Sequence, residues 1–244
     1  MAGVFRLAFR RIAPRGPSPS AQDWRWSLGA SDPSAGLISG TFAASDGAQI
    51  PYRIWPAAEP RALVLLLHGA FDYSGAFDEI GPRLAQRGFT ALAIDQRGFG
   101  ATQSRRQWCG IERMIGDVED AVGFLRARYG SRPVFILGES MGADVAIQAA
   151  GAKPDLGLTG LVLAAPGAVS DAMRRMLWGF LIKLLRIIAP NGEVKIERLS
   201  GQEFTAAGAI RLLCDPLVLR SVRPAMAAGL FDLAVSTVSA ARQV

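Results

Sequence analysis

The chain has 244 residues, half of them apolar and 20% charged, with a net charge of +6. A chain of this length and composition can bury one sizeable core, which excludes a fibrous or wholly disordered protein and favours a single globular enzyme-like domain. Half of the positive excess lies in residues 1–36, and no basic stripe interleaved with aromatic residues follows it. We therefore expect no nucleic-acid partner.

The two cysteines, Cys109 and Cys214, form no C-x-x-C pair and have no neighbouring histidine. This spacing predicts free thiols and neither a disulfide framework nor a metal site, and we expect no cofactor. The sequence contains no run of about twenty apolar residues, so we expect no transmembrane helix. A cytoplasmic location follows as the prediction, and peripheral membrane contact is left open.

Residues 1–36 are rich in Pro, Ser, Gly and Arg, which predicts a poorly ordered lead-in. Two short strands are expected next, Leu37–Ala43 and Gln49–Trp55. The turn at residues 45–47, Ser-Asp-Gly, joins them into a hairpin at the edge of a sheet.

Apolar runs of the length typical of buried strands then alternate with segments whose apolar residues are three and four apart. The predicted strands are Ala62–Leu67, Phe89–Ile94, Val134–Leu137 and Gly160–Ala164, and the predicted helices are Gly75–Arg87, Ile111–Tyr129 and Met141–Ala152. This alternation predicts an α/β fold over residues 37–169, with a doubly wound, mostly parallel sheet.

Residues 170–244 contain helical patterns and no further convincing strand, and they predict a helical cap over one end of the sheet. The expected helices are Asp171–Ile188, Gly201–Leu213 and Arg223–Arg242. The first of these is broadly apolar, with Trp178, Phe180, Leu181, Leu184, Leu185, Ile187 and Ile188. Two interpretations stay open for it: packing onto the sheet, which we favour, and contact with lipid.

The segment from Val134 to Ala143 carries the strongest chemical signal. A buried strand leads into Gly138-Glu139-Ser140-Met141-Gly142, a G-x-S-x-G motif, and a helix follows. This context is typical of a nucleophile elbow, in which a serine hydroxyl stands on a strained turn above the sheet. Gly138 and Gly142 are needed because strand and helix pass too closely for side chains.

A serine nucleophile also needs N–H donors that hold the oxyanion formed during attack. The amide of Met141 is one candidate, because it follows the nucleophile at a helix N-terminus. The loop after the strand Ala62–Leu67 begins with His68-Gly69-Ala70, and Ala70 is the candidate for the second donor.

Three motifs together resemble the α/β-hydrolase superfamily: Leu-Leu-Leu-His68-Gly69, then Asp95-Gln-Arg97-Gly98-Phe-Gly100, then the elbow around Ser140. The likeness is greatest to the monoacylglycerol lipase and lysophospholipase-like branch, which is also grouped with serine aminopeptidases. The resemblance implies that Ser140 is the nucleophile and that Ala70 and Met141 supply the oxyanion hole. It also implies a structural role for the loop containing Asp95, Arg97 and Gly98, and a lid after Ala165 that includes Asp215-Pro216-Leu217.

The same resemblance implies a triad acid and a triad histidine on loops after two further strands beyond the lid. The sequence has neither strand, so we expect the fold to lack its last strands, with one apolar sheet edge left unpaired, and the triad acid and histidine to be missing. The single histidine, His68, falls in the oxyanion loop, where we expect it to brace the loop. The available acids are expected to be solvated or capping residues: Asp144, Asp171, Asp215 and Asp232.

The leading hypothesis is a serine ester hydrolase of the lipase or lysophospholipase type, acting on a small acyl ester, with a fatty chain favoured by the apolar lid. The alternative is a truncated or degenerate, non-catalytic remnant that binds a lipid or a partner. An acyltransferase on the same scaffold would need the same triad and is not separated from a hydrolase by these motifs.

Overall fold

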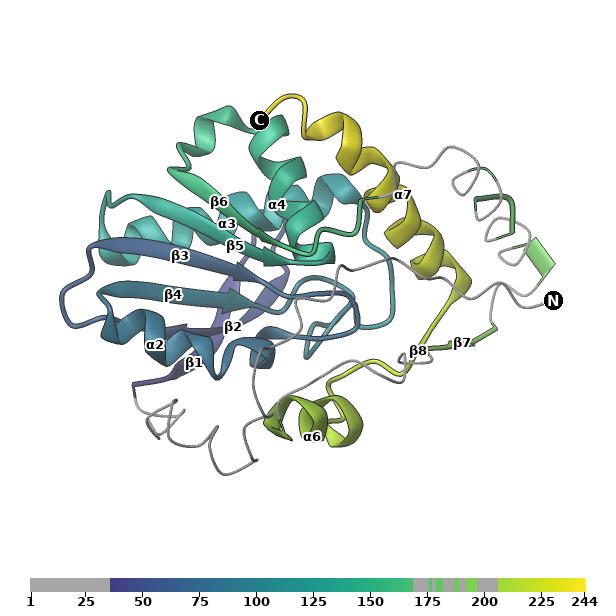
Figure 1. Ribbon diagram of the computed structural model, residues 1–244, viewed down its shortest axis with the longest axis horizontal. Coiled ribbons are helices and arrows are strands. Elements are labelled where there is room, and N and C mark those ends of the chain that lie inside the picture. Colours follow the sequence, from purple (N-terminus) through teal and green to yellow (C-terminus); the bar gives the residue numbers. More distant parts are fainter. Residues whose placement is uncertain (1–35, 169–175, 177–178, 182–186, 189–191, 197–205) are drawn as a thin grey trace, which may run out of the picture. The chain divides into compact units, whose positions relative to one another are not determined.

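The structure is a computed structural model that describes residues 36–168, 176, 179–181, 187–188, 192–196 and 206–244 (Figure 1). Residues Pro33–Val244 form one compact unit. The predicted lead-in lies outside the described residues except for Gly36, as does most of the predicted helix Asp171–Ile188. The division between core and cap at residue 169 stays a prediction.

A six-stranded sheet in the order β1-β2-β4-β3-β5-β6 forms the centre of the molecule. Its strands are β1 (Ile38–Ala43), β2 (Gln49–Trp55), β3 (Ala62–Leu67), β4 (Phe89–Ile94), β5 (Val134–Glu139) and β6 (Gly160–Ala164). The first two strands pair antiparallel with their neighbours, and β4, β3, β5 and β6 are parallel. The predicted hairpin, strand positions and mostly parallel sheet are therefore confirmed.

Helices cover both faces of this sheet, and the pleat of β3 shows how. Leu63, Leu65 and Leu67 belong to one apolar cluster together with α3 (Ile111–Tyr129) and α4 (Met141–Ala152). Val64 and Leu66 point the other way, into a second cluster beside α2 (Ile80–Gln86). Because successive side chains of a strand alternate between faces, a strand buried on both sides must be continuously apolar. The α/β-hydrolase fold class is confirmed.

The predicted helix Gly75–Arg87 was wrong in its first half. The structure has a short 3-10 turn, η1 (Ser74–Phe77), and the α-helix begins only at Ile80. Pro82 accounts for the break, because its ring would clash with the carbonyl of residue 78 in a continuous helix. Another 3-10 turn, η2 (Pro154–Leu156), follows α4.

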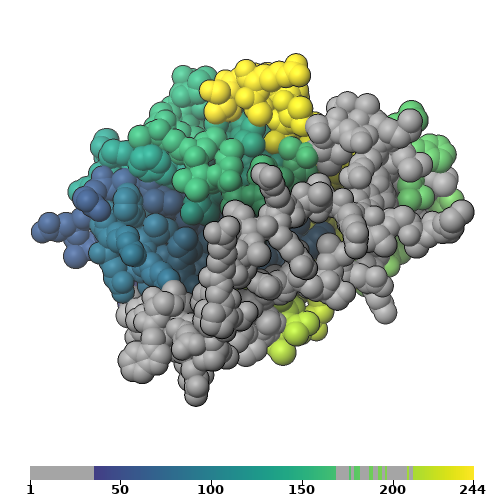
Figure 2. All heavy atoms as spheres, viewed as in Figure 1, coloured from purple at the N-terminus to yellow at the C-terminus, as the bar shows by residue number. Residues whose placement is uncertain are grey.

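After β6 the described chain contains α6 (Ala206–Cys214), α7 (Pro224–Ala240) and two very short strands. These strands, β7 (Val194–Lys195) and β8 (Ser221–Val222), pair antiparallel, so the expectation of no further strand was wrong. Two residues are too few to show any periodicity in the sequence. Helix α7 packs on α4, and its C-terminal end lies at the surface beside the α4 and β6 region (Figures 1 and 2).

Strand β6 stands at the end of the strand order and has one neighbour, β5, among the described strands. Two of its apolar side chains are exposed, Val162 by 54% and Leu163 by 39%, while Leu161 packs against the main apolar cluster. An uncovered apolar strand at the edge of a parallel sheet is unusual, because such strands are normally buried on both faces. The expectation of an apolar, unpaired edge agrees with β6 in the described chain.

Candidate active site

Ser140 joins the end of β5 to the start of α4 in a conformation that few residues other than glycine adopt. Its backbone angles are φ 51° and ψ −114°. The Ser140 amide donates to the carbonyl of Ala164, 2.8 Å away on β6, which holds the turn to the sheet. Such a backbone costs about 1–3 kcal/mol and persists only where the surroundings enforce it. The serine is half-buried at the N-terminus of α4.

The two glycines of the motif allow the close packing around this turn. A Cβ on Gly142 would collide with the backbone carbonyl of Leu67 at the end of β3, and one on Gly138 would collide with the carbonyl of Gly142. Helix α4 therefore begins directly against the carboxyl ends of β3 and β5. The strand-turn-helix geometry expected of a nucleophile elbow is present.

The loop after β3 lies beside the serine. A Cβ built on Gly69 would be 3.6 Å from the Ser140 Cβ and 3.6 Å from the carbonyl of Glu139. The next residue, Ala70, packs against the main apolar cluster, as does the buried Met141. The amides of Ala70 and Met141 donate no hydrogen bond to any other described residue. The assignment of these two amides to an oxyanion hole stays a prediction.

His68 is fully buried, and both of its ring nitrogens are engaged. The Gln96 amide donates to Nε2 over 3.0 Å, and Nδ1 lies 2.8 Å from the carbonyl of Gly69. Since Nε2 accepts, Nδ1 carries the proton and donates to that carbonyl. Burial lowers the pKa of His68, which keeps the ring neutral. With both nitrogens engaged, the ring braces the loop after β3 and has no ring nitrogen to offer the Ser140 hydroxyl.

The loop after β4 is held by charged side chains turned inward. The Asp95 carboxylate accepts hydrogen bonds from the amides of Ser74 and Ala101, at 2.9 and 2.8 Å. Arg97 donates two hydrogen bonds to Asp46 and three to the buried Asp117, at 2.7–3.0 Å. These contacts fix the hairpin turn, this loop and α3 against one another.

Asp144 departs from the expectation of a solvated or capping residue. It is 2% exposed, because α4 is covered by the sheet on one side and by α7 on the other. Burial raises its pKa to about 6, against partial stabilisation of the charge by the Gly167 amide and the Thr237 hydroxyl. Its Oδ1 has no hydrogen-bond partner among the described residues. Asp144 is the one charged residue in the α4 sequence, and that isolation was the available signal.

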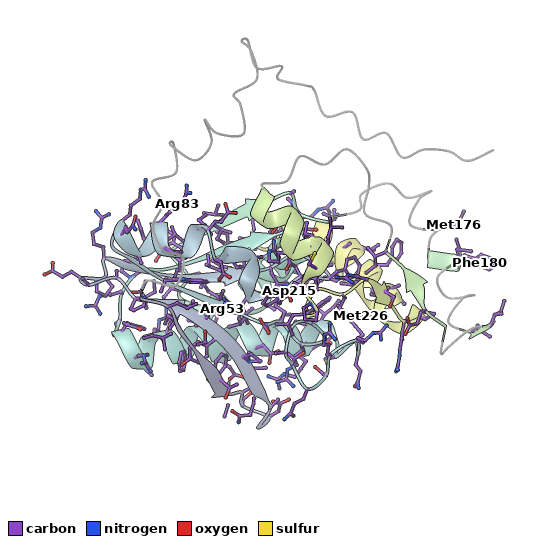
Figure 3. The ribbon with its side chains drawn as sticks, turned by 90° about the horizontal axis from the view of Figure 1, so that it is seen from below. Arg53, Arg83, Met176, Phe180, Asp215 and Met226 are labelled. Carbon is purple, nitrogen blue, oxygen red and sulfur yellow. The ribbon has the colours of Figure 1, made fainter. Side chains whose placement is uncertain are left out.

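Asp215 also has a specific role that the sequence did not reveal. Its carboxylate accepts a hydrogen bond from the Tyr73 hydroxyl at 2.6 Å and one from the Leu217 amide at 2.8 Å. The Arg53 guanidinium stacks over the Tyr73 ring at 5.7 Å, and Arg53 and Asp215 lie near each other in Figure 3. Asp232 is exposed on α7, as expected, and Asp171 lies outside the described residues.

The described part of the predicted apolar lid segment is exposed, against the favoured expectation that it packs onto the sheet. Met176 is 68% and Phe180 67% exposed, and Figure 3 shows both side chains projecting outward. Leu181, Ile187 and Ile188 are exposed as well, while Trp178, Leu184 and Leu185 lie outside the described residues. In the described chain no helix has the length and apolar character needed to cross a membrane.

The parallel sheet, the strained serine between β5 and α4 and the adjoining loop after β3 define an α/β hydrolase. The family model described as "Serine aminopeptidase, S33" matches residues 58–244. The chain belongs to this family.

Its relatives include monoacylglycerol lipases. The chain is 32% identical to the monoglyceride lipase homolog of Monkeypox virus over 151 residues, 61% of this chain and 54% of that protein. It is 27% identical to the monoacylglycerol lipase of Mycolicibacterium smegmatis over 190 residues, 76% of this chain and 66% of that protein. The structure of Paleococcus ferrophilus monoacylglycerol lipase superposes with a TM-score of 0.63, at 22% identity, over 80% of this chain and 72% of that one. The chain spans about half the length of the first curated relatives it matches.

Proposed function

We propose that this chain carries the nucleophile and oxyanion hole of a serine ester hydrolase acting on acyl esters. Ser140 attacks the ester carbonyl, and the amides of Ala70 and Met141 hold the resulting oxyanion. Collapse of this intermediate expels the alcohol and leaves an acyl-enzyme, which water hydrolyses. The observation that carries the proposal is the strained backbone of Ser140, φ 51°, with Gly69 directly beside it.

This chain has no free histidine that could act as the general base of the mechanism. Its one histidine, His68, uses both ring nitrogens in the loop after β3. Attack by serine requires a group that takes the hydroxyl proton and later protonates the leaving alcohol. We propose that this group comes from a strand-bearing segment that covers the exposed edge of β6 and is not among these 244 residues.

The names of the relatives and the exposed apolar lid residues support an ester with one fatty chain, such as a monoacylglycerol. Met176 and Phe180 are large apolar side chains open to solvent, which suits contact with an acyl chain or a lipid surface. A cytoplasmic location with peripheral membrane contact remains our prediction. Peptidase and acyltransferase activities would use the same nucleophile and are not separated from ester hydrolysis by these residues.

One observation favours a second candidate, a non-catalytic protein on this scaffold that binds lipid or a partner. Both ring nitrogens of His68 are engaged, so the proposed nucleophile Ser140 has no histidine base among the described residues. Such a protein would bind an acyl ester without turning it over.

A fluorophosphonate probe and nitrophenyl esters of short and long acyl chains separate the two candidates. The chain is assayed alone and fused to the C-terminal segment of a related lipase, each with a Ser140→Ala control. We expect the fusion to hydrolyse the esters and to be labelled at Ser140. A correctly folded fusion that is neither labelled nor active would contradict the hydrolase proposal and favour the binding protein.

A further inference from the structure

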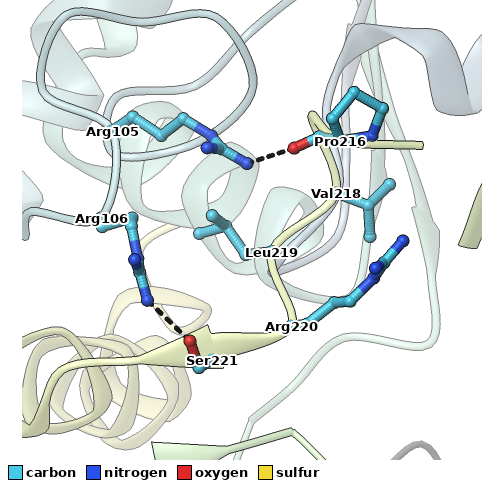
Figure 4. A pocket seen from close by; sticks show the side chains of 7 residues that line it. All are labelled: Arg105, Arg106, Pro216, Val218, Leu219, Arg220 and Ser221. Carbon is cyan, nitrogen blue, oxygen red and sulfur yellow. Dashed lines mark hydrogen bonds between the residues drawn. The ribbon is translucent and has the colours of Figure 1, made fainter. Parts of the chain in front are cut away.

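A hollow lined by arginines lies between the loop after β4 and the segment that leads into β8 (Figure 4). Arg105 and Arg106 come from the loop, and Arg220 and Ser221 come from the segment. The hollow has a volume of about 210 Å³. Since one liquid water takes about 30 Å³, the hollow can hold a phosphate group together with several waters.

The guanidinium groups of Arg105 and Arg220 are each held by one contact to a backbone carbonyl, which leaves other N–H donors unused among the described residues. Arg105 donates to the carbonyl of Pro216 at 2.6 Å, and Arg220 donates to the carbonyl of Leu213. Arg106 has a left-handed backbone, φ 69°, which is uncommon for a residue with a side chain. A guanidinium carries several donors in a planar fork, so one contact to a carbonyl orients the group and leaves donors for a further acceptor.

A carboxylate of the chain itself, that of Glu193, lies at the edge of this hollow. One oxygen of the Glu193 carboxylate accepts from Arg106 at 2.7 Å, and the other accepts from the Ser221 hydroxyl at 2.9 Å. The Ser221 hydroxyl and the Arg106 guanidinium are also 2.6 Å apart. This arrangement shows that the pair can hold two oxygens of one anionic group. Glu193 is exposed and is the one carboxylate paired with the three arginines in the described chain.

The remaining residues that line the hollow are apolar: Pro216, Val218 and Leu219. The Leu219 amide donates to the carbonyl of Phe71 at 2.8 Å, so this lining is fixed to the loop beside Ser140. Three cationic groups against one carboxylate leave a net positive charge around the hollow. Arginine pairs with phosphate through two parallel hydrogen bonds, and this charge favours a doubly charged anion over a neutral ligand.

We propose that this hollow is a binding site for a phosphate monoester group. Arg105 and Arg220 contact the phosphate oxygens, and Arg106 with Ser221 binds a further oxygen when Glu193 moves aside. Two sources share this chemistry: a small soluble phosphomonoester and the headgroup of an anionic lipid. The site does not depend on the competence of Ser140, so its test stands apart from the test of the proposed function.

Binding is measured by isothermal titration of the full chain with glycerol 3-phosphate and inorganic phosphate, with glycerol as the uncharged control. Sedimentation with phosphatidylcholine vesicles, with and without phosphatidic acid, tests the lipid source. We expect saturable binding that weakens as ionic strength rises, because the partly exposed charges are screened. Binding to the soluble esters alone assigns a soluble ligand, and binding to the phosphatidic acid vesicles alone assigns a lipid headgroup.

Three variants test the location of the site. Arg105→Gln combined with Arg220→Gln should weaken binding at least about tenfold, since hydrogen bonds to charged groups are among the strong ones. Glu193→Gln should tighten binding several-fold, because it removes the competing carboxylate. Arg83→Gln, on α2, removes one positive charge elsewhere and should leave the affinity unchanged (Figure 3).

Equal losses in Arg83→Gln and in the double variant would overturn the proposal, since binding would then follow overall charge. If the double variant fails to fold by circular dichroism, Glu193→Gln decides the question. An unchanged or weaker affinity in that exposed variant would overturn the proposal, and so would the absence of binding in the wild-type chain.

Discussion

The junction of β3, β5 and α4 and the edge formed by β6 show opposite degrees of constraint. At the junction, backbone passes backbone so closely that Gly142 cannot carry a side chain, and His68 is fully buried with both nitrogens bonded. At the edge, Val162 and Leu163 are open to solvent. The first region surrounds Ser140 with close backbone contacts, and the second offers an apolar strand with one described neighbour.

The two regions bear on two separate requirements of catalysis: the positioning of the reacting groups and the transfer of a proton. Positioning of a serine and of two amides depends on local backbone contacts, which residues 62–70 and 134–143 supply. Proton transfer depends on a base that reaches the serine from elsewhere in the fold. On the proposed function, the turn at Ser140 is formed by local contacts while the base has to come from elsewhere, and the following predictions probe each region.

The largest expected effect is on turnover. We expect this chain alone to hydrolyse nitrophenyl esters very slowly, and the fusion described above to be faster by about 10⁴-fold or more, because loss of the triad base costs up to about 10⁶-fold in a serine protease. Steady-state assays with and without Ser140→Ala measure the difference. Strong turnover by the unfused chain, lost in Ser140→Ala, would mean that a base other than histidine acts, and His68→Ala would then test whether the bracing role is correct.

Gly142→Ala should break the constrained region. The new methyl group would overlap the carbonyl of Leu67, so we expect the unfolding free energy to fall by about 3 kcal/mol or more. Gly123→Ala is the matched control, because nothing lies within 4 Å of a Cβ at this exposed position in α3. That control should gain about 0.5–1 kcal/mol from higher helix propensity. Chemical denaturation of both variants tests the contrast, and similar losses would contradict it.

Arg97→Met should weaken the loop that supports this region. The substitution leaves the buried Asp117 carboxylate without its main partner, since Arg113 is the other cation near it, at 3.6 Å. Removing one member of a buried ion pair costs about 3–5 kcal/mol. Lys153→Met, which breaks the exposed pair with Glu119, should change stability very little. Comparable effects in the two variants would show that the Arg97 network is only a surface feature.

The sequence was sufficient where a structure depends on local patterns. Continuous apolar runs located β3, β4, β5 and β6, and the spacing of Gly138, Ser140 and Gly142 identified the turn, since each glycine is required by a backbone contact. The bracing role of His68 in the loop after β3 was also expected from the resemblance. These features are determined by residues close together in the chain.

The features that the sequence did not reveal depend on tertiary neighbours. The burial of Asp144 results from α7, which lies about ninety positions further along the chain. The hydrogen bond between Tyr73 and Asp215 joins residues 142 positions apart. The short pair β7 and β8 and the arginines around the hollow likewise come together only in the folded chain. A pattern of a few residues carries no information about such contacts.

The smallest expected effect concerns the buried acid beside the elbow. Asp144 has a pKa of about 6 in the folded chain, above its ordinary value of 3.8. Because the folded form binds this proton more tightly than the unfolded form, protonation stabilises the fold. That stabilisation is complete below about pH 3.8 and is lost as the pH rises to about 6, with an upper limit of about 3 kcal/mol.

Asp144→Asn keeps the shape of the side chain and removes its titration. Other carboxylates also titrate in this range, so the informative quantity is the difference between wild type and variant in unfolding free energy from pH 4 to pH 6.5. We expect the wild type to lose about 1–3 kcal/mol more than Asp144→Asn over this interval. Asp232→Asn, on the exposed face of α7, controls for the loss of one carboxylate and should follow the wild type. Parallel pH profiles for wild type and Asp144→Asn would show that the acid is ionised in the folded chain without cost, which would require a partner for its Oδ1 beyond the described residues.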